Sequence, residues 1–159
     1  MHASVTDMWR AFLASGAAPP EAAAAPVSAW HFCDNQQDAD LCAALVLEGR
    51  KRATAPCVWG FTARGEPLPR AGEYHVVTDW QGIARCVIRT TATDIVPFNE
   101  VTAEHAAAEG EGDGSLAHWR ATHMAYYARE LAGTRFEPAD TMPVVCETFV
   151  VVFPSPGGA

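Results

Sequence analysis

The sequence predicts an α+β fold in which a few antiparallel strands curl into a small β-barrel with surrounding helices. Two β-branched runs, residues 74–78 and 84–90, flank the turn Asp-Trp-Gln-Gly and predict a hairpin. An apolar run over residues 142–153 predicts a strong last strand. Helical patterns lie before the hairpin and again between it and the last strand, as expected for helices inserted into an antiparallel sheet.

Length and composition fit one globular domain. The chain has 159 residues, of which 49% are hydrophobic and 19% are charged, enough for a core of ordinary size. The longest apolar stretches are far shorter than the roughly 20 residues that cross a bilayer, and residues 11–18 make a poor secretory signal. Five cysteines, odd in number and without C-x-x-C spacing, show no zinc or redox motif. We therefore expect a cytoplasmic protein without membrane contact.

The first element expected is a short amphipathic helix over residues 4–15, because Trp9, Phe12 and Leu13 fall on one of its faces. An Ala/Pro-rich linker follows. We divide the chain into an N-terminal helix and linker (1–26), the main domain (27–154) and a disordered tail (155–159). The N-terminal helix either pads the barrel or forms a dimer contact, so the oligomeric state stays open, with a homodimer as one possibility.

The main domain begins with an extended segment, residues 30–33, and a helix over residues 36–48 with a 3.6-residue apolar period. Gly49 suits the left-handed position after that helix. From Trp59 onward the pattern is typical of β-structure. Two more helices, residues 101–109 and 116–131, are separated by a glycine-rich break, and Thr102 and Ser115 are their expected N-caps.

Lys51 is the only lysine, while the other ten basic residues are arginines. An amine loses its proton when burial or a neighbouring cation lowers its pKa, whereas a guanidinium stays charged. Arg50 and Arg52 would have this effect if either side chain turned inward. A cation near a helix C-terminus is also favourable in itself, so the lysine has a structural explanation too.

Two motifs carry a resemblance to a known family. Residues 49–54 have the form G-x-K-x-x-T, and residues 109–123 read E-G-E-G-D-G-S-L-A-H-W-R-A-T-H. With the helix before Gly49, they resemble the ASCH family of the PUA-like superfamily, over roughly residues 30–153. The resemblance implies an ASCH fold, a small PUA-like β-barrel with surrounding helices.

The resemblance also implies activities. Some ASCH proteins look like amidohydrolases that remove an acyl group from the exocyclic amine of acylated cytidine; others are described as RNA-binding proteins or ribonucleases. The lysine and threonine of the amidohydrolase set correspond to Lys51 and Thr54. Their glutamate follows an H-A-x-x-E pattern, which Glu109 completes here, and Glu111 is a rival in the same segment.

Amide hydrolysis needs a nucleophile, a proton shuttle and a group that stabilises the oxyanion. Thr54 supplies a hydroxyl, and Lys51 acts either as its base or, if charged, as the oxyanion stabiliser; the residue types leave both roles open. Glu109 would activate water or protonate the leaving amine. Five further residues are expected to contact substrate, with structural packing as the alternative for the two aromatics: Phe32, Arg52, Trp59, Glu111 and Ser115.

The net charge of −8, from 11 basic and 19 acidic residues, disfavours a long nucleic-acid footprint, which needs a basic surface. It is compatible with a small nucleoside substrate or a short RNA. The alternatives are therefore a binding module for RNA or a modified base, with Arg50 and Arg52 on phosphates, or a ribonuclease using the same cleft. The histidines form no recognisable metal set, so neither a metal nor an organic cofactor is expected.

Overall fold

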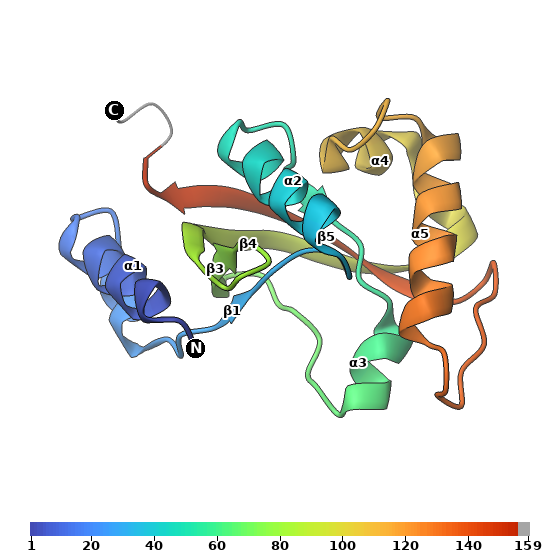
Figure 1. The fold of residues 1–159 in the computed structure, drawn as a ribbon, viewed down its shortest axis with the longest axis horizontal. Helices are drawn as coiled ribbons and strands as arrows, with labels where there is room; N and C mark the ends of the chain where they lie inside the picture. The colour runs from blue at the N-terminus through green and yellow to red at the C-terminus, as the bar shows by residue number, and fades with distance from the viewer. Residues whose placement is uncertain (156–159) are drawn as a thin grey trace.

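The computed structural model describes residues 1–155 and contains a five-stranded sheet flanked by helices (Figure 1). The α-helices are α1 (Ala3–Ala14), α2 (Gln36–Leu47), α3 (Val58–Arg64), α4 (Ala103–Glu109) and α5 (Leu116–Glu130). Short 3-10 helices cover Pro20–Ala24 and Phe98–Glu100. The strands are β1 (Ala29–Trp30), β2 (Ala53–Thr54), β3 (Tyr74–Thr78), β4 (Ala84–Pro97) and β5 (Pro143–Phe153).

The sheet has the order β1-β3-β4-β5-β2, which confirms the expected α+β class. Strands β3, β4, β5 and β2 pair antiparallel, and β1 pairs parallel with β3. The expected barrel is not closed, because within residues 1–155 no ladder joins the edge strands β1 and β2. Each of these edge strands has only two residues, too few to form a closing ladder.

The predicted hairpin and last strand are present. Strand β4 runs to Pro97, seven residues beyond the predicted end, and pairs with β5 from Val87 opposite Phe153 to Pro97 opposite Pro143. The sequence did not predict this extension because it includes the polar stretch Thr-Thr-Ala-Thr-Asp. The side chains of this stretch are mostly exposed, so it lacks the apolar pattern of a buried strand. These two strands are the longest in the sheet and carry the register that positions the site.

Helix α1 is part of the main core. Its residues Val5, Trp9 and Phe12 are buried in one apolar cluster with Tyr74 and Val76 of β3. Figure 1 shows α1 beside the β3–β4 end of the sheet. The N-terminal segment therefore pads the sheet, one of the two roles expected for it. The expected disordered tail lies outside the described residues except for its first member, Ser155.

The β-structure expected from Trp59 onward begins too early, because residues 58–64 form helix α3 and the first strand after them is β3. Valine, tryptophan and phenylalanine favour a strand, and an internal glycine disfavours a helix, so local propensity predicted the wrong element. Packing decides instead. The Trp59 ring stacks on Phe136 with centroids 5.2 Å apart, and a Cβ on Gly60 would lie 2.5 Å from a carboxylate oxygen of Glu130.

Two further clusters attach the other helices to the sheet. Cys42, Ala43 and Val46 of α2 pack against β3, β4 and β5, while Trp119 and Tyr127 of α5 belong to a second cluster with Phe98 and Val144. The segment after α2 is held between them, as described below. Within residues 1–155, none of the helices is long and apolar enough to span a bilayer.

Candidate functional site

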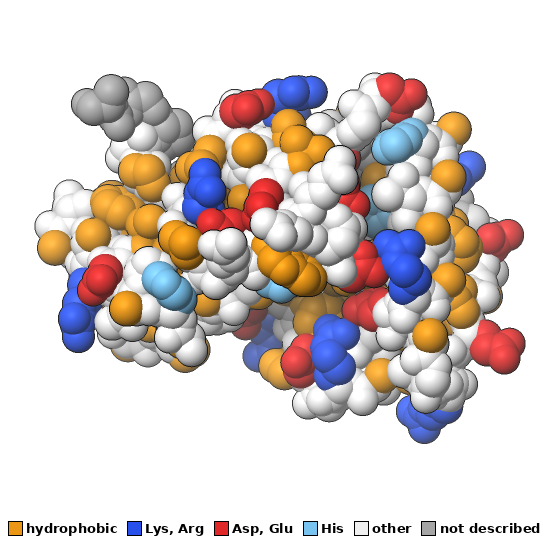
Figure 2. Space-filling view, viewed as in Figure 1, with side chains coloured by type: hydrophobic (Ala, Val, Ile, Leu, Met, Phe, Trp, Pro, Cys, Tyr) orange, Lys and Arg blue, Asp and Glu red, His pale blue; other side chains and the backbone are white. Residues whose placement is uncertain are grey.

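A cavity of about 1040 Å³ lies among β1, β2, α4, α5 and β5. Figure 2 shows the surface hollowed near the middle of the molecule, with acidic and basic side chains at its edge. Five of the eight residues predicted to form the site line this cavity, namely Phe32, Lys51, Thr54, Glu109 and Glu111. Residues far apart in the sequence thus share one concave surface, as ligand sites do.

Backbone contacts at the end of α2 place Lys51. Gly49 has φ +74°, the left-handed conformation predicted for it, and the amides of Arg50 and Lys51 both donate to the Leu45 carbonyl, at 2.9 and 3.0 Å. The Lys51 side chain then enters the interior and is only 2% exposed. Arg50 and Arg52 are exposed, so neither turns inward toward the amine.

Glycine at position 110 brings the acidic residues to Lys51. Gly110 ends α4 with φ +67°, and a Cβ there would lie 2.3 Å from the Arg50 carbonyl oxygen. The two backbone segments can approach so closely only because this residue has no side chain. The amide of Arg52 also donates to the Ala108 carbonyl at 2.8 Å. Glu109, the last residue of α4, is thereby fixed over the lysine.

Lys51 Nζ has three oxygen neighbours. It lies 3.2 Å from Glu109 Oε2, 2.5 Å from Glu111 Oε1 and 3.0 Å from the Ala53 carbonyl oxygen. The ammonium also lies 4.9 Å from the centroid of the Phe32 ring, a cation–π distance. Phe32 therefore faces the lysine, and both glutamates proposed from the sequence contact it.

The charges of this cluster are set by its own members. Burial alone would lower the pKa of Lys51, but the carboxylates of Glu109 and Glu111 outweigh it and raise that pKa above its ordinary value. Burial would raise the pKa of Glu109, but Lys51 and the rings of His105 and His123 hold it well below its ordinary value. The resting pair is an ammonium and a carboxylate, so the lowered lysine pKa considered from the sequence is not found.

The side chains around Glu109 were missed at the sequence level as parts of the site. Trp119 Nε1 donates to Glu109 Oε1 at 2.8 Å. His105 Nε2 lies 3.4 Å from Oε1 and His123 Nε2 lies 3.3 Å from Oε2. The available signals were the i,i+4 spacing of His105 and Glu109 on one helix face and the tryptophan in the second motif. Glu109 is thus enclosed on all sides and only 1% exposed.

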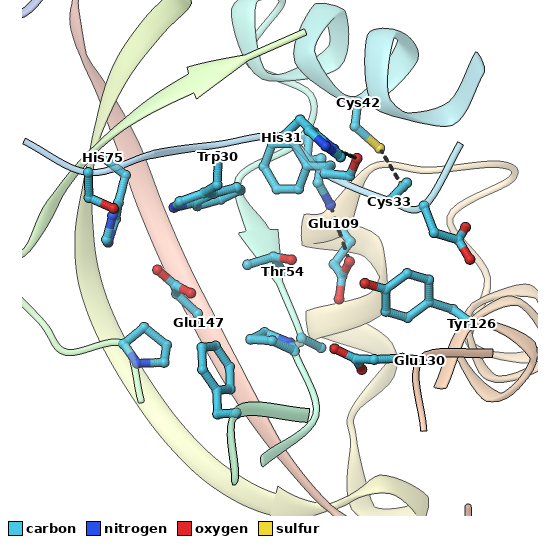
Figure 3. A pocket seen from close by; sticks show the side chains of 18 of the residues that line it. Trp30, His31, Cys33, Cys42, Thr54, His75, Glu109, Tyr126, Glu130 and Glu147 are labelled. Atoms are coloured by element: carbon cyan, nitrogen blue, oxygen red, sulfur yellow. Dashed lines mark hydrogen bonds and ion pairs between the residues drawn. The ribbon is translucent and has the colours of Figure 1, made fainter. Parts of the chain in front are cut away.

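Thr54 lies in β2 directly opposite Glu147 of β5. Residues opposite each other in an antiparallel pair share a face of the sheet, and both side chains line the cavity. Figure 3 shows Thr54 between Glu147 and Glu109. Glu147 is 3% exposed and accepts a 2.6 Å hydrogen bond from Thr90 Oγ1. The signal for it was a carboxylate inside an otherwise apolar strand.

Three predicted substrate contacts do not line the cavity. Trp59 packs against Phe136, as described above, and Ser115 is the N-cap of α5, where its Oγ accepts from the His118 amide at 3.1 Å. Arg52 lines a separate shallow hollow of about 280 Å³ beside the glycine-rich loop. Among the described residues, no group of three or more His, Cys, Asp or Glu side chains is arranged to hold a metal ion.

Among the charged side chains that line the cavity, acidic ones outnumber basic ones. Nine acidic residues line it against three basic ones. All three basic side chains are paired with carboxylates: Lys51 as above, Arg64 with Glu66 and Glu130, and Arg129 with Asp34. One end of the cavity holds Trp30, His75 and Glu147, and the other holds Tyr126 and Glu130 (Figure 3). A cavity with this charge favours neutral or cationic ligands.

This sheet, with a buried lysine on the segment before its edge strand β2, defines a PUA-like domain. A model of the ASCH domain matches residues 28–153, and the chain belongs to the ASCH domain family. It is similar to the crystal structure of an ASCH domain from Lactobacillus crispatus JV V101, with 34% identity, a TM-score of 0.87 and 96% of each chain covered. It is also similar to a protein from Enterococcus faecalis V583, with 29% identity, a TM-score of 0.83, and coverage of 99% of this chain and 95% of that one. A search of curated proteins gave no significant match.

Proposed function

We propose that this protein is an amidohydrolase that removes an acyl group from the exocyclic amine of acylated cytidine or a related nucleoside. The observation that carries the proposal is the charged cluster of Lys51, Glu109 and Glu111 in the same cavity as the Thr54 hydroxyl. A nucleophile, a cation for the oxyanion and carboxylates for proton transfer are the groups that acyl transfer requires.

The cavity also suits a flat, uncharged substrate. Its volume lies at the upper end of the range usual for small-molecule sites, about 300–1,000 Å³. Trp30, Phe32 and Tyr126 line it and offer apolar surface for a base. The excess of acidic residues opposes phosphate groups, which favours a nucleoside over a nucleotide as substrate. We place the reaction in the cytoplasm, as expected from the sequence.

In the proposed reaction Thr54 Oγ attacks the acyl carbonyl carbon. Its proton passes to Lys51 as the lysine passes one of its own to Glu111, whose carboxylate oxygen is 2.5 Å away. This relay leaves Lys51 charged, so the ammonium also stabilises the oxyanion. Glu109 holds the lysine in place. An arginine at position 51 would keep the charge but could not relay the proton.

The test is an assay in which the protein is incubated with acetylated cytidine and the release of free cytidine is measured by chromatography. We expect turnover by the wild type and losses of at least about 100-fold for Lys51→Arg and Thr54→Val, the scale of a lost acid–base group or nucleophile. Thr54→Ser keeps a hydroxyl and should retain activity. Circular dichroism of each variant checks the fold. If the wild type releases no cytidine, the proposed activity is wrong.

Binding of RNA or of a modified base is the second candidate, since PUA-like domains are often linked to RNA binding. The observation in its favour is the shallow hollow lined by Arg50 and Arg52, which shares Gly112 with the main cavity. A base in the cavity could then place its phosphate near these arginines. A gel shift of short RNA that Arg50→Ser/Arg52→Ser abolishes, without cytidine release, would favour this function. Degradation of the RNA that needs Lys51 would favour a ribonuclease.

A further inference from the structure

Glu147 is a buried carboxyl group with an incomplete set of partners. Among the ion pairs formed within residues 1–155, none involves Glu147. The Thr90 hydroxyl donates a hydrogen bond to its Oε1. A buried carboxylate without a cation is costly, and Figure 3 shows the Glu147 carboxyl group in the cavity rather than in the apolar core. A group of this kind in a substrate cavity is a candidate for a chemical role.

The sheet register places Glu147 next to the proposed nucleophile. Because Thr54 and Glu147 are direct partners of the β2–β5 pair, their Cβ atoms are about 4.5–5.5 Å apart on one face. An acyl group attacked by Thr54 would therefore have its leaving nitrogen within reach of a flexible glutamate side chain. No segment has to move to bring the two side chains into one site.

The reaction needs a proton donor, and Glu109 cannot act as one. A departing amine must take up a proton, yet Glu109 is held ionised by Lys51 and its other donors. Glu147 differs, because burial raises its pKa. The hydrogen bond from Thr90 opposes this and the nearby charge of Glu73 adds to it, so that the pKa is raised overall. Two carboxyl groups whose environments push their pKa values apart divide the acid and base roles between them.

We propose that Glu147 is a further catalytic residue, which protonates the leaving exocyclic nitrogen and later deprotonates the water that releases the acyl group. The inference rests on the proposed amidohydrolase function and adds a proton donor for the leaving nitrogen, while Glu111 holds the proton of Thr54. His75 lines the same end of the cavity, but burial lowers its pKa. It is therefore less readily protonated than an ordinary histidine, so it opposes the raised pKa of Glu147 less than a free imidazole would.

The protons balance over the cycle. In the first half Thr54 gives its proton through Lys51 to Glu111, the C–N bond breaks, and Glu147 gives its proton to the nitrogen. In the second half water attacks the acyl-threonine ester and gives a proton to Glu147. Glu111 returns its proton through Lys51 to Thr54 Oγ as the C–O bond breaks. Both glutamates end as they began, and the products are the free amine and a carboxylic acid.

Two substrates test this role. Acetylated cytidine needs a proton on its leaving nitrogen, whereas p-nitrophenyl acetate releases a phenolate that leaves without one. We expect Glu147→Gln to lower kcat on acetylated cytidine by at least about 100-fold. Single-turnover release of p-nitrophenolate, which reports acyl transfer to Thr54 before water attacks, should change less than about threefold. Thr54→Val should lose both reactions. The amide oxygen introduced by Glu147→Gln can still accept the Thr90 hydrogen bond, so the variant is expected to fold.

The pH profile gives a second readout. The wild-type kcat should fall as pH rises through the raised pKa of Glu147, because the acid must be protonated. Lys51 does not cause this fall, since its pKa is raised above the ordinary lysine value. Glu73→Gln removes a neighbouring negative charge, lowers the Glu147 pKa and should move the fall to lower pH, while Glu147→Gln should abolish it.

The outcomes separate the two proposals. If the wild type hydrolyses acetylated cytidine and Glu147→Gln does so equally well, the assignment of Glu147 is wrong and the amidohydrolase stands. Equal losses of amide turnover and of single-turnover p-nitrophenolate release would also overturn it, because ester acyl transfer needs no acid and its loss indicates a structural role. If Glu147→Gln folds poorly, the wild-type pH profile decides. A wild-type kcat that does not fall as pH rises would also show that the assignment of Glu147 is wrong. If the wild type hydrolyses no amide, the proposed function itself fails.

Discussion

Removing the lysine ammonium should destabilise the protein measurably. Lys51 and Glu109 side chains are both 1% exposed, with 3.2 Å between Nζ and Oε2, so solvent screens their interaction little. Lys51→Met leaves Glu109 charged and buried, and breaking such a pair costs about 3–5 kcal/mol. Glu111 is 24% exposed and can turn to water. For a chain of this length the loss corresponds to a fall in Tm of roughly 6–20 °C, at about 2–4 °C per kcal/mol.

The double variant isolates the pair from other effects of the substitution. Glu109→Gln removes the partner charge and can keep its carbonyl on Trp119, so Lys51→Met/Glu109→Gln should be more stable than Lys51→Met alone. Urea unfolding followed by tryptophan fluorescence gives the free energies, and the double-mutant cycle gives the coupling. A loss below about 1 kcal/mol for Lys51→Met, or strictly additive losses in the double variant, would show that the two charges are not a buried pair.

Three further outcomes follow from the same contacts. The Glu109 pKa is lowered in the folded state, so ionised Glu109 stabilises the fold above its ordinary pKa of 4.5. The free energy of unfolding should therefore decline as pH falls below 4.5, by up to about 1.4 kcal/mol per pH unit. Glu109→Gln should lack this part of the acid dependence. Gly110→Ala adds a clash with the Arg50 carbonyl to the strain of φ +67°, whereas Gly114→Ala at φ +74° meets nothing within 4 Å. Gly114→Ala should therefore lower the free energy of unfolding by only about 1–2 kcal/mol. Gly110→Ala should lower it more, as measured by thermal unfolding. Trp119→Phe, which removes the 2.8 Å bond to Glu109, should cost about 1.5–3 kcal/mol, and a cost near zero would mean that water replaces the indole.

Much of the fold could be predicted because its elements carry strong local signals. The α2 helix, its glycine stop and the hairpin are specified by periodicity and turn residues, and they appear close to where those signals place them. The convergence of Lys51 and Glu109 was expected from family resemblance, not from the residues themselves. Fifty-eight positions separate them, and no local pattern encodes contact over that distance.

The remaining features depend on tertiary contacts. Tertiary packing stabilises helix α3, although its residues are poor helix formers. Trp59 stacks on Phe136, and Gly60 leaves room for Glu130. Arg52 and Ser115 were expected near substrate because they are adjacent in sequence to site residues. Adjacent residues of an extended segment point in opposite directions, and Ser115 is used as a helix cap. Glu147 was overlooked because only the β2–β5 register shows which residue it faces.

The lone lysine has a physical explanation in this arrangement. A buried arginine would also carry the positive charge, but its planar group has five N–H donors, whereas three oxygen atoms contact Nζ here, one from each glutamate and one from a carbonyl. It could also pass on no proton. Lysine fits three acceptors with three donors and can exchange a proton with Glu111 while the total charge of the cluster stays constant. If the proposed relay operates, both demands act together at this position, whereas the exposed Arg50 and Arg52 on either side of it meet neither.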